Sequence, residues 1–156
     1  MVAAIRATVV IIMTEARGKC LCGAVRVTVM SEMAEISACH CDMCRRWSGS
    51  MQMGIEVAPN QIRIEGGPIS RYRSSSFAER AWCKICGSAL WFKDLGEDDP
   101  YEVAPGLFEN AGGARLVREV YADKCPDGYA FAGDLQRVSQ ADFERQNKFV
   151  PEGESQ

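Results

Sequence analysis

The sequence predicts a mainly β fold: a single domain of folded antiparallel sheets built around a structural zinc, with few short helices. Short strand-like runs alternate with turn residues along most of the chain. Seven of the eight cysteines fall into three tight groups with metal-ligand spacing. The length of 156 residues, with 47% hydrophobic and 25% charged residues, suits one compact domain and requires no second one.

The predicted strands are short and lie between turn signals. The first, 19–30, alternates apolar and polar residues, and a typical turn follows at 66–68. Two short helices are expected at 41–47 and 139–146, the second because Ser139 and Asp142 have the spacing of a capping box. The remaining strands are expected at 51–57, 62–65, 69–73, 89–92 and 101–105.

The chain divides into a central domain and two flanking segments. Residues 1–16 are expected to form an N-terminal extension or a first strand, 17–145 the zinc-binding domain, and 146–156 a polar C-terminal tail. The apolar opening contains Arg6, lacks a basic start and is too short to span a bilayer. It therefore predicts neither a membrane anchor nor a secretion signal, and Met13 is an alternative initiator.

Charge and cysteine usage exclude several classes of protein. A formal net charge of -3 and a pI near 5.3 give no general attraction to nucleic acid or anionic lipid, so neither nucleic acid nor membrane is expected as a partner. A secreted disulfide framework is the competing interpretation of eight cysteines. However, intervals of two or three residues are too close to cross-link distant segments efficiently. The sequence therefore predicts a cytoplasmic, metal-binding protein.

Two of the cysteine groups form the two halves of one closed zinc site. On an extended strand Cys20 and Cys22 project to the same face, and Leu21 projects to the other. Cys83 and Cys86, followed by Gly87, have the form of a knuckle that folds over a metal. Four thiolates satisfy a tetrahedral zinc, so these residues predict a structural site.

The middle group offers only three thiolates, at Cys39, Cys41 and Cys44. Catalytic zinc usually has three protein ligands and an open position, so this group predicts a second, catalytic zinc that is more labile than the first. A fourth protein donor is a less favoured alternative, and the candidates for it are His40, Asp42 and Cys125. If Cys39 and Cys41 lie on one face of an extended segment, His40 faces the opposite side.

The three groups and their neighbours resemble the glutathione-dependent formaldehyde-activating enzyme family, which includes the centromere protein V relatives. The resemblance covers residues 17–145. It implies a mainly β domain with one structural and one catalytic zinc, and reversible addition of glutathione to formaldehyde, a carbon-sulfur lyase activity. The motifs that carry it are Gly18-x-Cys20-x-Cys22-Gly23-x-Val25, Cys39-His40-Cys41-x-x-Cys44-Arg45-x-x-x-Gly49 and Cys83-x-x-Cys86-Gly87-x-x-Leu90.

Two further hypotheses concern the substrate. Arg45 and Arg46 follow the last ligand and are expected either to meet the carboxylates of glutathione or to be surface charges. Three thiolates weaken the Lewis acidity of zinc, which favours thiolate delivery over water activation. A non-catalytic zinc module that binds a protein partner is the main alternative function, and a thiol redox or metal-buffering protein is a weaker one.

Overall fold

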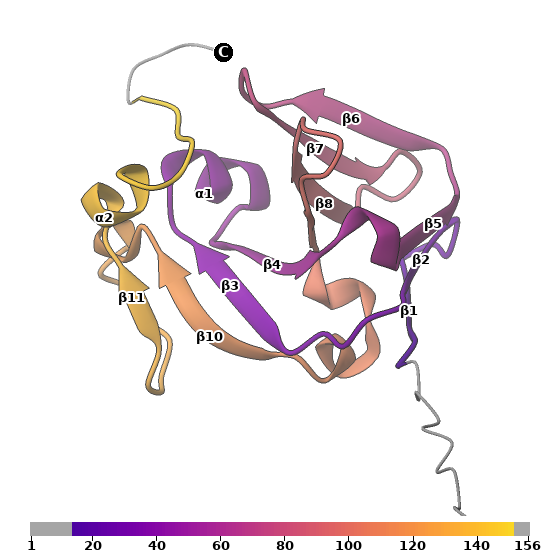
Figure 1. The fold of residues 1–156 in the computed structure, drawn as a ribbon, viewed down its shortest axis with the longest axis horizontal. Helices are drawn as coiled ribbons and strands as arrows, with labels where there is room; N and C mark the ends of the chain where they lie inside the picture. Colours follow the sequence, from indigo (N-terminus) through magenta and orange to yellow (C-terminus); the bar gives the residue numbers. More distant parts are fainter. Residues whose placement is uncertain (1–13, 152–156) are drawn as a thin grey trace, which may run out of the picture.

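The computed structural model describes residues 14–151, and these form two β-sheets with two short α-helices (Figure 1). The prediction of a mainly β fold with few short helices is confirmed. The possible first strand within residues 1–13, and Met13 itself, lie outside the described residues. No helix among the described residues is long and apolar enough to cross a membrane.

The smaller sheet has three strands in the order β1-β2-β5, and the larger has eight in the order β11-β10-β3-β4-β9-β8-β7-β6. Most neighbours pair antiparallel, as predicted, but β10 runs parallel to both β3 and β11. The strands are β1 (Ala16–Lys19), β2 (Val25–Val29), β3 (Glu35–Cys39), β4 (Gln52–Val57), β5 (Ile62–Gly66), β6 (Ile69–Arg73), β7 (Ala78–Cys83), β8 (Ala89–Asp94), β9 (Tyr101–Val103), β10 (Arg115–Val120) and β11 (Gln136–Val138).

Both short helices begin at side-chain caps. Helix α1 (Asp42–Ser48) follows Cys41, whose side chain accepts from the backbone N–H of Cys44, and it ends at Gly49 in the left-handed conformation. Helix α2 (Gln140–Glu144) follows Ser139, whose side chain accepts from the N–H of Asp142, as the capping-box spacing predicts. The 3-10 helices are Pro59–Gln61, Pro105–Leu107, Glu109–Gly113 and Ala122–Lys124.

The hydrophobic core joins the two sheets. Alternate residues Val25, Val27 and Val29 of β2 are buried, as the period of a strand requires, and they belong to the same cluster as Ile55 and Leu90 of the larger sheet. Gly18 of β1 lies so close to the chain at 107–108 that an added Cβ would sit 2.9 Å from a backbone oxygen. The core thus fixes the smaller sheet, and with it the turn that follows Lys19.

Several strand predictions need correction. The predicted strand 19–30 is a strand only over β2, and its first part is a turn at 20–24 that follows the end of β1, because Gly23 adopts φ +77° and its N–H donates to the carbonyl of Cys20 at 3.0 Å. Strands β3, β7, β10 and β11 were not predicted. In β10 the charged residue Glu119 is buried, which breaks the polar-apolar alternation that marks a strand.

Candidate metal centres and the adjoining cavity

The sulfur atoms of Cys20, Cys22, Cys83 and Cys86 converge, all lying within 4.8 Å of one another. The Sγ atoms of Cys20 and Cys22 are 3.6 Å apart, and those of Cys22 and Cys83 are 3.8 Å apart. A Zn–S bond of about 2.3 Å in a tetrahedron places its sulfurs about 3.8 Å apart. These separations exclude disulfide bonds, whose sulfurs lie about 2 Å apart, and they fit a four-thiolate zinc.

The two halves of this group are similar turns from distant parts of the chain. Gly23 closes the first turn on Cys20, and Gly87, at φ +75°, closes the second by donating to the carbonyl of Cys83 at 2.8 Å. The convergence of Cys20 and Cys22 was predicted, but a turn produces it rather than a strand. Leu21 points away from the sulfurs, with 87% of its surface exposed.

Hydrogen bonds favour the thiolate form at two of these four cysteines. At Cys22 a backbone hydrogen bond at Ala24 lowers the pKa, but burial and the neighbouring thiols outweigh it and raise the pKa to about 12. The backbone N–H of Val25 donates to the sulfur of Cys20 at 3.3 Å, and this contributes to the lowered pKa of a thiol that burial would otherwise raise. The hydroxyl of Ser88 lies 3.2 Å from the sulfur of Cys86 and lowers its pKa to about 5. Thiolates are the metal-binding form of cysteine, so these contacts favour metal uptake.

The second group, Cys39, Cys41 and Cys44, lies where β3 passes into α1, and its three sulfurs are also within 4.8 Å of one another. Cys44 is buried and the other two are partly exposed. Hydrogen bonds from Cys39 and Cys44 lower the pKa of Cys41 to about 2, whereas bonds to Cys41 and Cys44 raise the pKa of Cys39. Hydrogen bonds among the three thiols therefore favour one negative charge in this group, at Cys41.

A buried arginine adjoins the second group. Arg80 of β7 is only 2% exposed, and its guanidinium donates to Cys44 Sγ at 3.6 Å and to Gln52 Oε1. Its flat face also lies against the rings of Trp47 and Phe92, with centroids 5.7 and 5.0 Å away. A fixed positive charge in contact with this sulfur stabilises the thiolate form of Cys44.

His40 and Cys125 are separate from the three-thiol group. His40 is fully buried on the other side of the segment, with Nε2 2.8 Å from Glu119 Oε1, and Glu119 also pairs with Arg137 at 3.0 Å. Cys125 lies near this pair rather than near Cys41. The side chain of His40 thus tethers the segment 39–44 to β10 through Glu119. It points away from the three thiols, as expected if it is not a fourth ligand.

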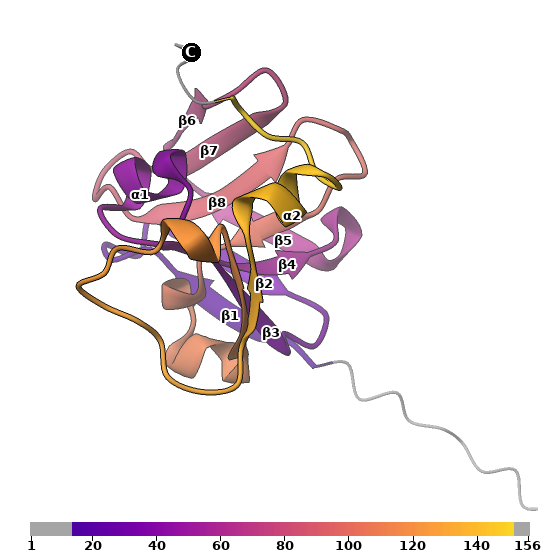
Figure 2. The ribbon, with the colours of Figure 1, turned by 90° about the vertical axis from the view of Figure 1, so that its left-hand side faces the viewer.

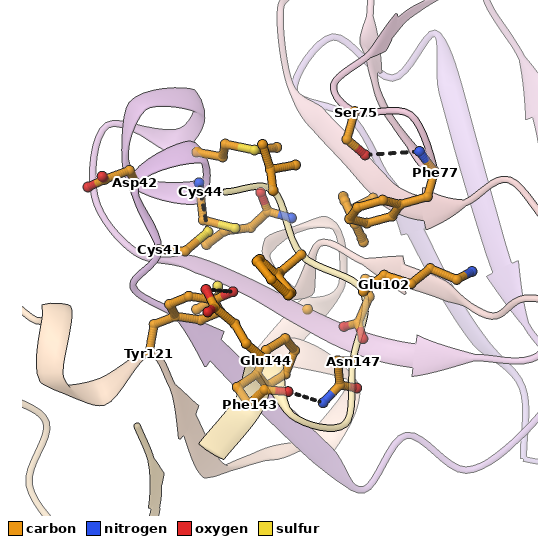
Figure 3. Close-up of a pocket in the computed structure, with 18 of the residues that line it drawn as sticks. Cys41, Asp42, Cys44, Ser75, Phe77, Glu102, Tyr121, Phe143, Glu144 and Asn147 are labelled. Carbon is orange, nitrogen blue, oxygen red and sulfur yellow. Dashed lines mark hydrogen bonds between the residues drawn. The ribbon is translucent and has the colours of Figure 1, made fainter. Parts of the chain in front are cut away.

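One face of the larger sheet forms the floor of a cavity of about 560 Å³ beside the second group. The register places successive residues on that face: Cys39 is opposite Gln52, and Phe92 is opposite both Glu102 and Arg80. Helices α1 and α2 stand on the same side of this sheet (Figure 2), and residues 147–151 of the predicted tail complete the wall. Figure 3 shows Cys41 and Cys44 beside α1, with Glu102 across the cavity.

The two predicted substrate arginines differ in their surroundings. Arg45 donates to the carbonyl of His40 at 2.9 Å and pairs with Asp42, so its charge supports the ligand segment. Arg46 is 79% exposed on its side chain, and it lines the mouth of the cavity. Its guanidinium lies 3.8 Å from Asp42 Oδ2, so Arg46 makes a long, exposed ion pair, whereas Arg45 is held by two contacts.

Sequence reasoning missed the cavity floor. Arg80 and Glu102 belong to strands that pair through register rather than through sequence proximity. The sequence did contain one indication for Arg80, which is a charged residue between the small apolar residues Ala78 and Ala81. All three are buried in the structure, and a buried charge without a partner is costly. Using that signal would have required recognising β7 first.

The sequence is similar to a known family and to two named proteins. A sequence model of the family described as glutathione-dependent formaldehyde-activating enzyme matches residues 15–124. An uncharacterized lyase of Schizosaccharomyces pombe is 36% identical over 120 residues, which is 77% of this chain and 88% of that protein. A Halomonas elongata protein, provisionally named a glutathione-dependent formaldehyde-activating enzyme, is 33% identical over 86 residues, which is 49% of this chain and 55% of that protein.

One solved structure shares the fold. The crystal structure of a Rhodobacter sphaeroides protein superposes with a TM-score of 0.50 at 23% sequence identity. The match covers 60% of this chain and 87% of that chain. At this identity the likeness concerns the fold alone.

Proposed function

Because the chain belongs to the glutathione-dependent formaldehyde-activating enzyme family, we propose that it is a zinc-dependent carbon-sulfur lyase. The proposed reaction is the reversible addition of a small thiol, such as glutathione, to formaldehyde or a related small electrophile. One observation carries the proposal: three converging thiols lie at one end of a cavity of about 560 Å³. A cavity of this size suits a small molecule.

The metal assignment follows from the donor sets. Cys20, Cys22, Cys83 and Cys86 would hold a structural zinc, and Cys39, Cys41 and Cys44 a labile one with an open position. Zinc bound at the second group would supply a positive centre that favours the thiolate form of a substrate thiol. Free thiolates in this number suit a reducing compartment, so we place the protein in the cytoplasm.

The chain's own residues orient the substrate around that position. Arg80 donates to Cys44 and Gln52, which fixes two residues of the floor beside the open position. Arg46 at the mouth offers a donor for a substrate carboxylate. The segment 147–151 forms part of the cavity wall beside these residues. We assign the activity to the predicted domain 17–145. Residues 147–151 complete the wall of its cavity.

A protein-binding zinc module is the second candidate function. It is favoured by Leu21 and Ile85, which are 87% and 61% exposed at the tips of the two knuckles. The two functions differ in what they require of the second group, because only the lyase needs Cys41 for chemistry.

Glutathione binding and adduct formation test the proposed function together. Glutathione is expected to shift the amide signals of residues 39–49 more than those around Cys83, and only with the second zinc bound. Formaldehyde and glutathione should then reach adduct equilibrium faster with the protein than in buffer. Cys41→Ser should abolish the acceleration, whereas the control Cys125→Ser, outside both groups, should retain it. Binding without acceleration would reject the lyase in favour of a binding module.

A further inference from the structure

Glu102 is the carboxylate in the cavity without a partner. It projects from β9 into the cavity, and among residues 14–151 its carboxylate accepts no hydrogen bond and forms no ion pair. Every other carboxylate that lines the cavity is paired. Asp42 pairs with Arg45 and Arg46, Asp94 pairs with Lys148, and Glu144 accepts from Tyr121 and Gln140. A half-buried carboxyl left unpaired in a cavity is costly, which points to a functional role.

The neighbouring strand leaves room for this side chain. Glu102 pairs with Glu56 across β4, but its carboxylate leans along β4 and lies over Gly54, where an added Cβ would collide with Oε2. Gly54 in turn is opposite Ser37, two residues before Cys39. The missing side chain at Gly54 therefore lets the carboxylate point from β9 toward the three-thiol group.

The remaining gap suits a small substrate. From strand spacing and rise, the backbone of Gly54 is about 8 Å from that of Cys39. A sulfur held at the three-thiol group, a one-carbon unit and a hydrogen-bonded oxygen together span about 5 to 6 Å, which fits within that backbone separation. The Glu102 carboxylate thus lines the same cavity, on the side toward which the oxygen of a thiol-aldehyde adduct held at the three thiols would extend.

The surroundings of Glu102 raise the pKa of its carboxyl group toward 7. Burial, together with the charges of Glu56 and Asp94, raises its pKa to about 7 against the opposing effect of Arg118. A group of this pKa is present in both protonation states at neutral pH, as proton transfer requires. The other charged groups that line the cavity are Arg80 on β7, Asp42 and Arg46 on α1, Lys124, Glu144 on α2 and Lys148 in the C-terminal segment.

We propose that Glu102 is the general acid and base of this site, an inference that rests on the proposed function. In the forward direction the substrate thiol loses its proton to solvent and its sulfur forms a bond to the aldehyde carbon. The carbonyl π electrons move to the oxygen, which takes the proton of the Glu102 carboxyl, and the carboxylate then regains a proton from solvent. The net reaction is thiol plus aldehyde giving hydroxyalkyl thioether. In reverse, the carboxylate takes the hydroxyl proton as the carbon-sulfur bond breaks.

Glu102→Gln removes the proton-transferring group with little change of size. With zinc-loaded protein, the rate of adduct formation from glutathione and formaldehyde should fall by about 100-fold or more, mainly in kcat. The wild-type rate should change with pH around 7, and the variant should lose that dependence. Glutathione should still shift the amide signals of residues 39–49 in the variant. Glu109→Gln, outside the cavity, is the matched control and should behave as wild type.

The outcomes separate this proposal from the function on which it rests. Wild-type acceleration that persists in Glu102→Gln, with the same pH profile, would overturn the role of Glu102 and leave the lyase function intact. A raised KM with unchanged kcat would also overturn it, since Glu102 would then bind substrate rather than transfer a proton. A wild-type protein that accelerates nothing would overturn both. Gly54→Ala, which displaces the carboxylate without removing it, should lower kcat as well.

Discussion

The pH dependence of stability gives an independent measure of the state of Glu102. Its pKa is about 7 in the folded protein because burial disfavours the charged form, against about 4.3 in an unfolded chain. The unfolded chain therefore releases this proton at lower pH than the folded protein. The stability that the protonated carboxyl provides is present below about pH 4.3 and is lost as the pH rises toward 7.

Glu102→Gln should remove this pH-dependent loss of stability, because glutamine does not ionise. At pH 5 the variant should gain about 1 kcal/mol over wild type from this effect, and at pH 8.5 at most about 3 to 4 kcal/mol, since each pKa unit corresponds to about 1.4 kcal/mol. Because Glu102 is partly exposed, solvent reduces the upper figure. Urea unfolding of zinc-loaded wild type and variant at the two pH values measures the difference. A difference that stays constant between pH 5 and 8.5 would refute the raised pKa.

Three further predictions test the metal centres and the core. Cys83→Ser should unfold the domain, because structural zinc contributes on the order of 10 kcal/mol in small modules, whereas Cys41→Ser should keep the circular dichroism spectrum of wild type. Equal unfolding of the two variants would contradict the division into structural and labile sites. Arg80→Met should weaken zinc binding at the three-thiol group by about 10-fold to 100-fold in a chelator competition, because a ligand sulfur loses its charged neighbour. The exposed Arg71→Met, with a side chain 58% accessible, should leave zinc affinity unchanged, and equal affinities for both variants would argue against this role of the Arg80 charge. Gly18→Ala should lower the free energy of unfolding by about 1 to 3 kcal/mol, because its Cβ would lie 2.9 Å from Leu107 O; unchanged urea midpoints would indicate that the contact relaxes freely.

Local spacing was enough to predict what depends on neighbours in the sequence. Cysteines two or three residues apart must present their sulfurs together in a strand or in a turn, so the grouping of Cys20 with Cys22 was predictable even though the conformation was not. The cap at Ser139 was predictable for the same reason.

Other features depend on long-range pairing and could not be predicted in this way. The cavity floor combines residues of β3, β4, β7, β8 and β9, and only the register of those strands places Arg80 and Glu102 on one face. Strand β10 was missed because Glu119 is buried through its contacts with His40 and Arg137, a compensation that the sequence pattern does not reveal. The residues proposed for chemistry beyond the ligands therefore become visible only in the fold.

Metal content tests the central claim of a closed four-thiolate site and an open three-thiolate site most directly. Elemental analysis of zinc-reconstituted protein should give two zinc ions per chain, with one removed by a mild chelator and the other retained. Cys41→Ser should contain only the retained ion. A single tightly held zinc in the reconstituted wild type, unchanged by Cys41→Ser, would contradict the account.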